Sequence, residues 1–158
     1  MSDGGKGMVD VSGKDVTRRV AVAESVLSAD EPTLAALREN RLPKADPLPT
    51  ARAAALLALK ATPNLIPHCH TIPVTDATVE FELGPDTVTV RCTVGTVART
   101  GAEMEALVGA SVAALTLYDM IKSICRGAQI VRTRLLEKSG GKSGHWRAED
   151  DGAQGCSH

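Results

Sequence analysis

Two short segments of this sequence combine residue types and spacings that suit catalysis. In the first, Asp119 and Lys122 stand three positions apart. On a helix, side chains at this spacing share one face, so a carboxylate and an ammonium there can exchange protons with one bound substrate. The apolar neighbours Met120, Ile121 and Ile124 favour this interpretation, because nearby buried surface shifts pKa values. The alternative is an ordinary surface ion pair, which adds less than about 1 kcal/mol to stability.

The second segment is the loop 138–144, which contains three glycines and the two lysines Lys138 and Lys142. It differs from a nucleotide-binding P-loop, because Leu136 stands where that motif needs its first glycine and no helix pattern follows. We predict instead that exposed backbone N–H groups and the two lysines bind an anion. A solvated linker before the C-terminal tail is the alternative.

Two glutamates lie at the start of the helix that carries Asp119. Thr100 and Glu103 have the spacing of a capping box, which favours a structural role for Glu103. Glu105 has no capping role. At ~100° per residue it lies within about 40° of Asp119 around the helix, so it is a candidate to face a substrate.

A third group, His68, Cys69 and His70, lies in a loop bracketed by Pro67 and Pro73. Three adjacent residues do not readily close a tetrahedral metal site, and no partner cluster is evident, so we predict no metal. A rigid loop that presents one imidazole to a ligand and a purely structural histidine remain equally open.

Lys44 and Arg52 flank a proline-rich stretch at 40–49. Single cations at such places usually face solvent. Arg52, however, falls in the first turn of an Ala-rich helix, where the helix dipole disfavours a cation. This placement mildly favours an anionic partner for Arg52.

Hydrophobic periodicity and turn residues predict the elements that position these side chains. We expect strands at 16–27, 78–83, 87–94 and 130–136, a short helix capped by Ser28 and ending at 39, and helices at 50–61 and 100–125. The order matches the split βαβ, or ferredoxin-like, pattern. The predicted fold is therefore an α+β ferredoxin-like sandwich, an antiparallel sheet with helices on one face.

Composition limits the classes of function. The 158 residues fit one domain, and with a single Phe, Tyr and Trp its lean core suggests completion by subunit contacts. A net charge of −1 and so few aromatic residues argue against nucleic-acid binding. The N-terminus lacks an apolar signal core and we find no membrane-spanning run, so we expect a cytoplasmic protein. Because the four cysteines have no CxxC spacing, we expect free thiols.

We expect disordered residues 1–8, a single domain at 9–146 and a disordered tail at 147–158.

Across residues 8–146 the sequence resembles the molybdenum cofactor biosynthesis protein C family, the cyclic pyranopterin monophosphate synthases. The matching segments are 8–12, 50–52, 65–67, 69–70, 100–101, 103–107, 113–116, 118–120, 122 and 137–144. Several positions depart from the family pattern. His68 replaces the usual leucine before the Cys-His pair, and Thr71 replaces the proline after it. Ala45 replaces the glycine after Lys44, and Pro47 and Pro49 are additions to that loop. Ile121 replaces the common cysteine before Lys122.

The resemblance implies a homohexamer, a trimer of dimers with active sites at the dimer interfaces, and no cofactor. It implies conversion of (8S)-3′,8-cyclo-7,8-dihydroguanosine 5′-triphosphate to cyclic pyranopterin monophosphate and diphosphate. The catalytic pair would be Asp119 and Lys122. The implied or predicted substrate-binding residues are His68, Cys69, His70, Met104, Glu105, Lys44, Arg52, Glu103, Lys138 and Lys142. The alternative is a non-catalytic ferredoxin-like module that binds a nucleotide.

Overall fold

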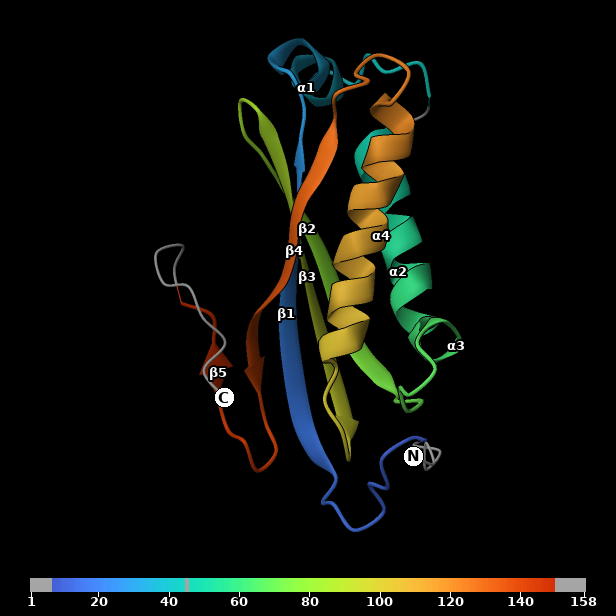
Figure 1. Ribbon diagram of the computed structural model, residues 1–158, viewed down its shortest axis with the longest axis vertical. Coiled ribbons are helices and arrows are strands. Elements are labelled where there is room, and N and C mark those ends of the chain that lie inside the picture. Colours follow the sequence, from blue (N-terminus) through green and yellow to red (C-terminus); the bar gives the residue numbers. More distant parts are fainter. Residues whose placement is uncertain (1–6, 45, 150–158) are drawn as a thin grey trace, which may run out of the picture.

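The computed structural model describes residues 7–44 and 46–149. The expectations for the terminal segments 1–6 and 150–158 lie outside the described residues. One antiparallel sheet spans the molecule, with strand order β2-β3-β1-β4-β5 (Figure 1). Its strands are β1 Thr17–Ser28, β2 Val74–Leu83, β3 Thr87–Ala98, β4 Gln129–Ser139 and β5 Trp146–Arg147. The first four have the ferredoxin-like order, so the predicted fold is confirmed.

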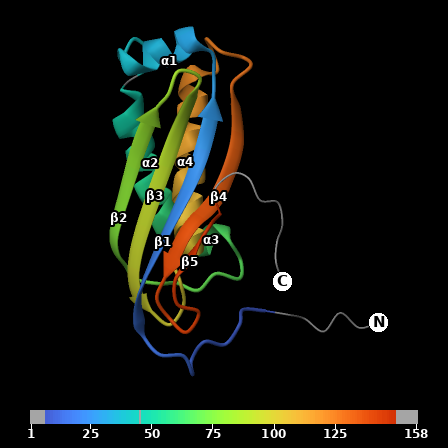
Figure 2. The same ribbon diagram turned by 90° about the vertical axis from the view of Figure 1, so that its left-hand side faces the viewer.

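The helices gather on one face of this sheet and at its ends. They are α1 Glu31–Arg38, α2 Pro47–Lys60, α3 Thr62–Leu65 and α4 Glu103–Ile121. Helices α2 and α4 run side by side behind the sheet when the opposite face is viewed (Figure 2). Helix α4 runs along the strands, so its first and last turns lie at opposite ends of the molecule (Figure 1).

Small residues let α4 approach the sheet and α2 closely. Ala106, Ala110, Ala113 and Ala114 are fully buried in the core. At Gly109 a Cβ atom would lie 2.7 Å from the Cys92 sulfur, closer than real side chains pack. The Ala-rich, aromatic-poor composition is therefore explained by the close packing of α4 against the sheet and α2, which leaves room only for small side chains in the core.

The helix starts differ from the sequence predictions. Asp30, not Ser28, caps α1, because its carboxylate accepts the Thr33 N–H at 2.9 Å. Helix α2 begins at Pro47 rather than at residue 50, since proline needs no hydrogen-bond acceptor in a first turn. Ala102 precedes α4 and no side chain caps that helix, so the capping box predicted for Glu103 is wrong.

The ends of other helices and strands differ from the predicted ends by a few residues. Helix α4 ends at Ile121 rather than at 125, and β4 continues to Ser139, which places Lys138 on a strand rather than in the loop. The short helix α3 and the strand β5 were not predicted. Strand β5 includes Arg147, and the Ala148 N–H donates to the Leu136 carbonyl at 2.8 Å.

Helix α4 is also long and apolar enough to cross a membrane by length and composition, whereas no membrane-spanning run was predicted from the sequence. Half of its most apolar window is buried inside the fold, as is usual for the core helix of a packed domain. Cys92 and Cys125 are buried free thiols, Cys69 is a partly buried one, and Cys156 lies outside the described residues. Burial raises the pKa of Cys92 to about 11.

Candidate active site

The predicted site residues gather at the two ends of α4. Lys44, Asp119 and Lys122 meet at its C-terminal end and form what we call the carboxylate–lysine cluster. The first turn of α4 and the adjoining loops hold most of the others. Between Glu105 and Asp119 lie about 21 Å of straight helix at ~1.5 Å per residue. Since α4 begins at Glu103, both residues belong to one continuous helix.

In the carboxylate–lysine cluster, two ammonium groups flank one carboxylate. The Nζ atoms of Lys122 and Lys44 each lie 2.7 Å from a different oxygen of Asp119. Lys44 also donates to the Asp119 carbonyl at 3.0 Å. The side chains of Lys44, Asp119 and Lys122 are 47%, 52% and 55% exposed, so the cluster is open to solvent or to a partner.

The electrostatics of this cluster correct a sequence prediction. Hydrogen bonds from Lys122 and then Lys44 lower the pKa of Asp119 to about 2, and Asp119 raises the pKa of Lys122. In the single chain these pKa values therefore move away from neutrality, not toward it. The reason is the orientation of the side chains. Met120 and Ile121 face the core, whereas Asp119 is turned ~100° from Met120 around the helix and faces outward. Burial is therefore too slight to shift its pKa toward neutrality.

At the other end of α4, a small hollow of about 130 Å³ forms what we call the histidine pocket. Its lining residues are His68, Cys69, His70, Thr100, Gly101, Glu103, Met104 and Glu105. The His-Cys-His segment follows α3, while the last three residues form the first turn of α4. The structure thus brings together the two segments that the family resemblance assigned to substrate contact.

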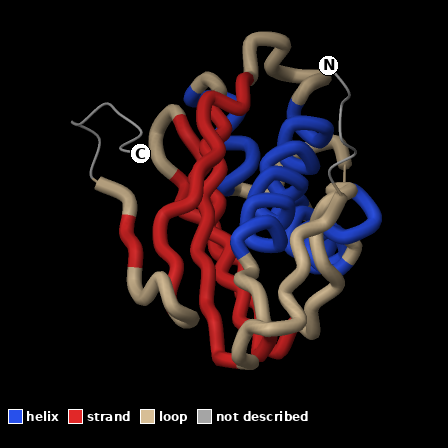
Figure 3. Tube along the Cα trace, turned by 60° about the horizontal axis from the view of Figure 1, so that its bottom comes forward, coloured by secondary structure: helices blue, strands red, loops and turns tan. Residues whose placement is uncertain are grey.

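Beside the histidine pocket, Glu103 and Lys138 form an ion pair at 3.3 Å. They line a narrow hollow that also contains Gly101, Arg19 and Ser143. This hollow shares Gly101 and Glu103 with the histidine pocket, and Arg19 and Ser143 with a third hollow. The three hollows therefore adjoin one another among the loops at this end of the molecule, which Figure 3 turns forward.

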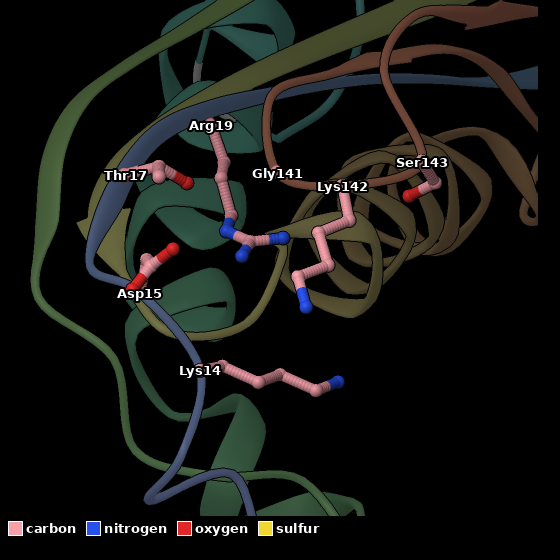
Figure 4. A pocket seen from close by; sticks show the side chains of 7 residues that line it. All are labelled: Lys14, Asp15, Thr17, Arg19, Gly141, Lys142 and Ser143. Atoms are coloured by element: carbon pink, nitrogen blue, oxygen red, sulfur yellow. The ribbon is translucent and has the colours of Figure 1, made fainter.

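The third hollow, of about 530 Å³, is the basic pocket (Figure 4). It is lined by Lys14, Asp15, Thr17, Arg19, Gly141, Lys142 and Ser143. The charged side chains in its lining are three cations, Lys14, Arg19 and Lys142, and one carboxylate, Asp15. The loop 138–144, predicted to bind an anion, thus forms one wall of the basic pocket.

Two contacts hold the wall of the basic pocket in place. Arg19 donates to the Ala98 carbonyl at 3.3 Å and to the Arg99 carbonyl at 3.1 Å, which fixes its guanidinium. Gly140 and Gly141 have φ of +95° and +74°. A Cβ atom on either glycine would collide with Arg18 or Arg19, so the loop can lie this close only with glycine there.

Lys14, Thr17 and Arg19 line the basic pocket but were not predicted from the sequence. The available signal was the cluster of cations at Lys14, Arg18 and Arg19, directly after the matching segment 8–12. Spacing along the chain could not show that this segment lies against the loop 138–144. That proximity follows from the antiparallel pairing of β1 with β4, in which Val20 faces Ser139.

Arg52 lies apart from the three hollows. Its guanidinium stands 5.4 Å above the Phe81 ring and donates to the Val79 carbonyl at 3.1 Å. These contacts explain a cation in the first part of α2 without a substrate, and a substrate role for Arg52 stays a prediction. Among the described residues, no three His, Cys, Asp or Glu side chains gather closely enough to hold a metal ion.

The subunit is ferredoxin-like, and cations, histidines and carboxylates line its adjoining hollows. These features are typical of an enzyme that binds a small phosphorylated metabolite. The chain belongs to the MoaC family, whose model matches residues 8–141. It is 49% identical to a cyclic pyranopterin monophosphate synthase of Thermomicrobium roseum, over 93% of this chain and 90% of that protein.

Two further relatives carry the same name. The Streptomyces avermitilis protein is 48% identical over 88% of this chain and 82% of its own length. The protein from a Nocardioides species is 46% identical, over 88% and 87% of the two chains. The family resemblance found in the sequence is thereby confirmed.

Proposed function

We propose that this chain is a cyclic pyranopterin monophosphate synthase of molybdenum cofactor biosynthesis. It converts (8S)-3′,8-cyclo-7,8-dihydroguanosine 5′-triphosphate to cyclic pyranopterin monophosphate and diphosphate, and is thus a lyase. The observation that carries this proposal is the near-50% identity to synthases over most of both chains. Residues 9–146 act as one catalytic domain, in the cytoplasm.

The hollows at the N-terminal end of α4 suit the two chemical parts of this substrate. The histidine pocket offers imidazole, thiol and carboxyl groups to the base-derived rings. Lys138 and the basic pocket offer cations to the triphosphate. Diphosphate leaves more readily when fixed cations stabilise the negative charge on its oxygens. Lys14, Arg19 and Lys142 thus assist the step in which the cyclic phosphate forms.

The carboxylate–lysine cluster reaches such a substrate only from a second subunit, because about 21 Å of helix separates it from Glu105. Val112 lies midway between Glu105 and Asp119. A two-fold axis near Val112 would bring each Asp119 beside the Glu105 of the other subunit and would create two equal sites. The resemblance adds that three such dimers form a homohexamer.

The outward face of α4 supports this pairing. Met104, Val108, Ser111 and Leu115 lie within about 60° of one another around the helix. All four are partly or fully exposed, and Leu115 is 57% exposed. A second copy of the chain, packed antiparallel along this face, would bury the apolar side chains.

The direct test is to incubate the purified protein with the cyclic dihydro-GTP derivative. We expect diphosphate and, after oxidation, a fluorescent pterin to appear in equal amounts. A non-catalytic nucleotide-binding module would bind the same compound, as seen by calorimetry, and release no diphosphate. Binding without product would therefore refute the synthase assignment.

Lys138→Ala is expected to raise KM about tenfold or more and to change kcat little, since a phosphate clamp acts on the ground state and the transition state alike. Lys60→Ala, which removes an exposed lysine in the last turn of α2, is the matched control. Steady-state kinetics separate the two constants. If KM stayed constant and only kcat fell, Lys138 would take part in the chemical step instead.

A further inference from the structure

The stretch before β1, residues 10–16, carries Lys14 to the basic pocket, and we call it the N-terminal segment. It belongs to no helix or strand, and all of its residues except Val11 are exposed. Little buried surface therefore fixes the path of the chain here. Lys14 nevertheless lines the same hollow as Lys142 of the loop 138–144 (Figure 4). Polar contacts must hold the segment in this position.

The side chain of Arg99, which directly follows β3, makes these contacts. One nitrogen of its guanidinium group donates to the Ser12 carbonyl at 2.9 Å and also to the Lys14 carbonyl. The Lys14 N–H donates to the Val11 carbonyl at 3.0 Å, which closes a turn between these acceptors. Among the described residues, no other side chain from outside the N-terminal segment forms a hydrogen bond with it. Arg99 is therefore the main link between this turn and the sheet.

The backbone of Arg99 contacts the second cation of the basic pocket. Its carbonyl accepts a hydrogen bond from the Arg19 guanidinium at 3.1 Å. Arg99 thus contacts Lys14 through its side chain and Arg19 through its main chain. It lines none of the three hollows itself. Any effect of the Arg99 side chain on a ligand of the basic pocket therefore passes through Lys14.

Holding Lys14 in advance favours binding of an anion. A cation that is already in place loses less conformational entropy when its partner arrives. The lysine side chain is flexible, so the position of its backbone decides which region its ammonium group can reach. Without the two bonds from Arg99, the exposed turn is free to move, and Lys14 then meets an anion in the pocket less often.

We propose that Arg99 is a positioning residue, which holds Lys14 at the basic pocket so that the pocket is ready for the phosphate groups of the substrate. This inference rests on the proposed function. It concerns the side chain of Arg99 alone, because any substitution leaves the backbone carbonyl that orients Arg19 in place.

Arg99→Met tests this role, because methionine keeps an unbranched apolar side chain and removes every hydrogen-bond donor. We expect kcat/KM to fall and the Kd for inorganic diphosphate to rise, each about tenfold, as for loss of a hydrogen bond to a charged group. Tm should change little, since Arg99 is exposed. Arg38→Met is the matched control. It removes a guanidinium that donates to the Gly84 carbonyl at 2.8 Å, at the opposite end of the sheet (Figure 1).

A double-mutant cycle separates positioning from direct binding. If Arg99 acts through Lys14, its substitution has nothing left to displace once the Lys14 ammonium is absent. We therefore expect Lys14→Ala combined with Arg99→Met to match Lys14→Ala alone within about twofold, in both kcat/KM and diphosphate affinity. A further tenfold loss in the double variant would overturn the proposal, because Arg99 would then act on the ligand independently of Lys14.

The single variant can also overturn the proposal. Losses of less than about twofold in both kcat/KM and diphosphate affinity would show that Lys14 needs no support from Arg99. Calorimetric titration with diphosphate requires no turnover, so it distinguishes this failure from failure of the synthase assignment. A wild type that binds diphosphate without turnover would refute the assignment and leave the comparison of variants valid. A wild type that neither turns over nor binds diphosphate would refute both.

Discussion

Asp119→Asn should reduce turnover at least about a hundredfold without unfolding the protein, because under the proposed function it removes a charge that stabilises the transition state. The side chain is 52% exposed and lies outside the core, and its ion pairs are screened by solvent and add little stability, so we expect only a small decrease in Tm at pH 7. The change leaves Lys44 and Lys122 without their carboxylate. Lys122→Ala should have a comparable effect on kcat, since it removes the other charge of the pair.

The measurement is kcat for diphosphate release, together with thermal unfolding of each variant. Asp86→Asn, in the exposed turn between β2 and β3, is the matched control and should behave as wild type. An unchanged kcat in either Asp119→Asn or Lys122→Ala would remove that residue from the catalytic site. Loss of the folded state instead would show that the cluster is structural.

The pH dependence of stability follows from the same cluster. The pKa of Asp119 is lowered in the folded state, so its ion pairs stabilise the protein above the unfolded value near 3.8. That contribution is lost as the pH falls from 3.8 through about 2. Glu105 behaves in the opposite way: burial raises its pKa, so stability declines as the pH rises above 4.5 and through the folded value.

The sequence predicted the sheet well because its alternation is strong. Val88, Val90, Cys92 and Val94 are all fully buried, as their period-two pattern indicates. The helix starts were harder, since several residues near each start could act as a cap. At α1 both Ser28 and Asp30 were available, and only the path of the chain decides between them.

The candidate site was predicted by residue type but not by arrangement. Family resemblance selected His70, Glu105, Asp119 and Lys122, and the ~21 Å of helix between Glu105 and Asp119 showed that one straight helix could not bring these two residues together. Two features of the site became visible only in the three-dimensional structure. One is the outward orientation of Asp119, which keeps both charges of its pair. The other is the pairing of β1 with β4, which carries Arg19 to the loop 138–144.

Mixing two inactive variants should restore activity if the site is shared between subunits. In Asp119→Asn the histidine pocket is intact, and in Glu105→Gln the carboxylate–lysine cluster is intact. A mixed dimer then contains one site with both functional halves and one site with neither. Random exchange of equal amounts makes about half of the dimers mixed, and half of their sites functional, so about one quarter of wild-type activity should return.

Native mass spectrometry would establish that subunits have exchanged before diphosphate release is measured. Mixing Asp119→Asn with Lys122→Ala is the matched control: both changes lie in the carboxylate–lysine cluster, so every mixed site keeps one defect and activity should stay lost. Helix α4 begins at Glu103, which leaves no bend of the chain by which a single subunit could bring Glu105 to its own Asp119. Absence of recovery despite proven exchange would therefore mean that the two ends of α4 do not serve the same substrate molecule.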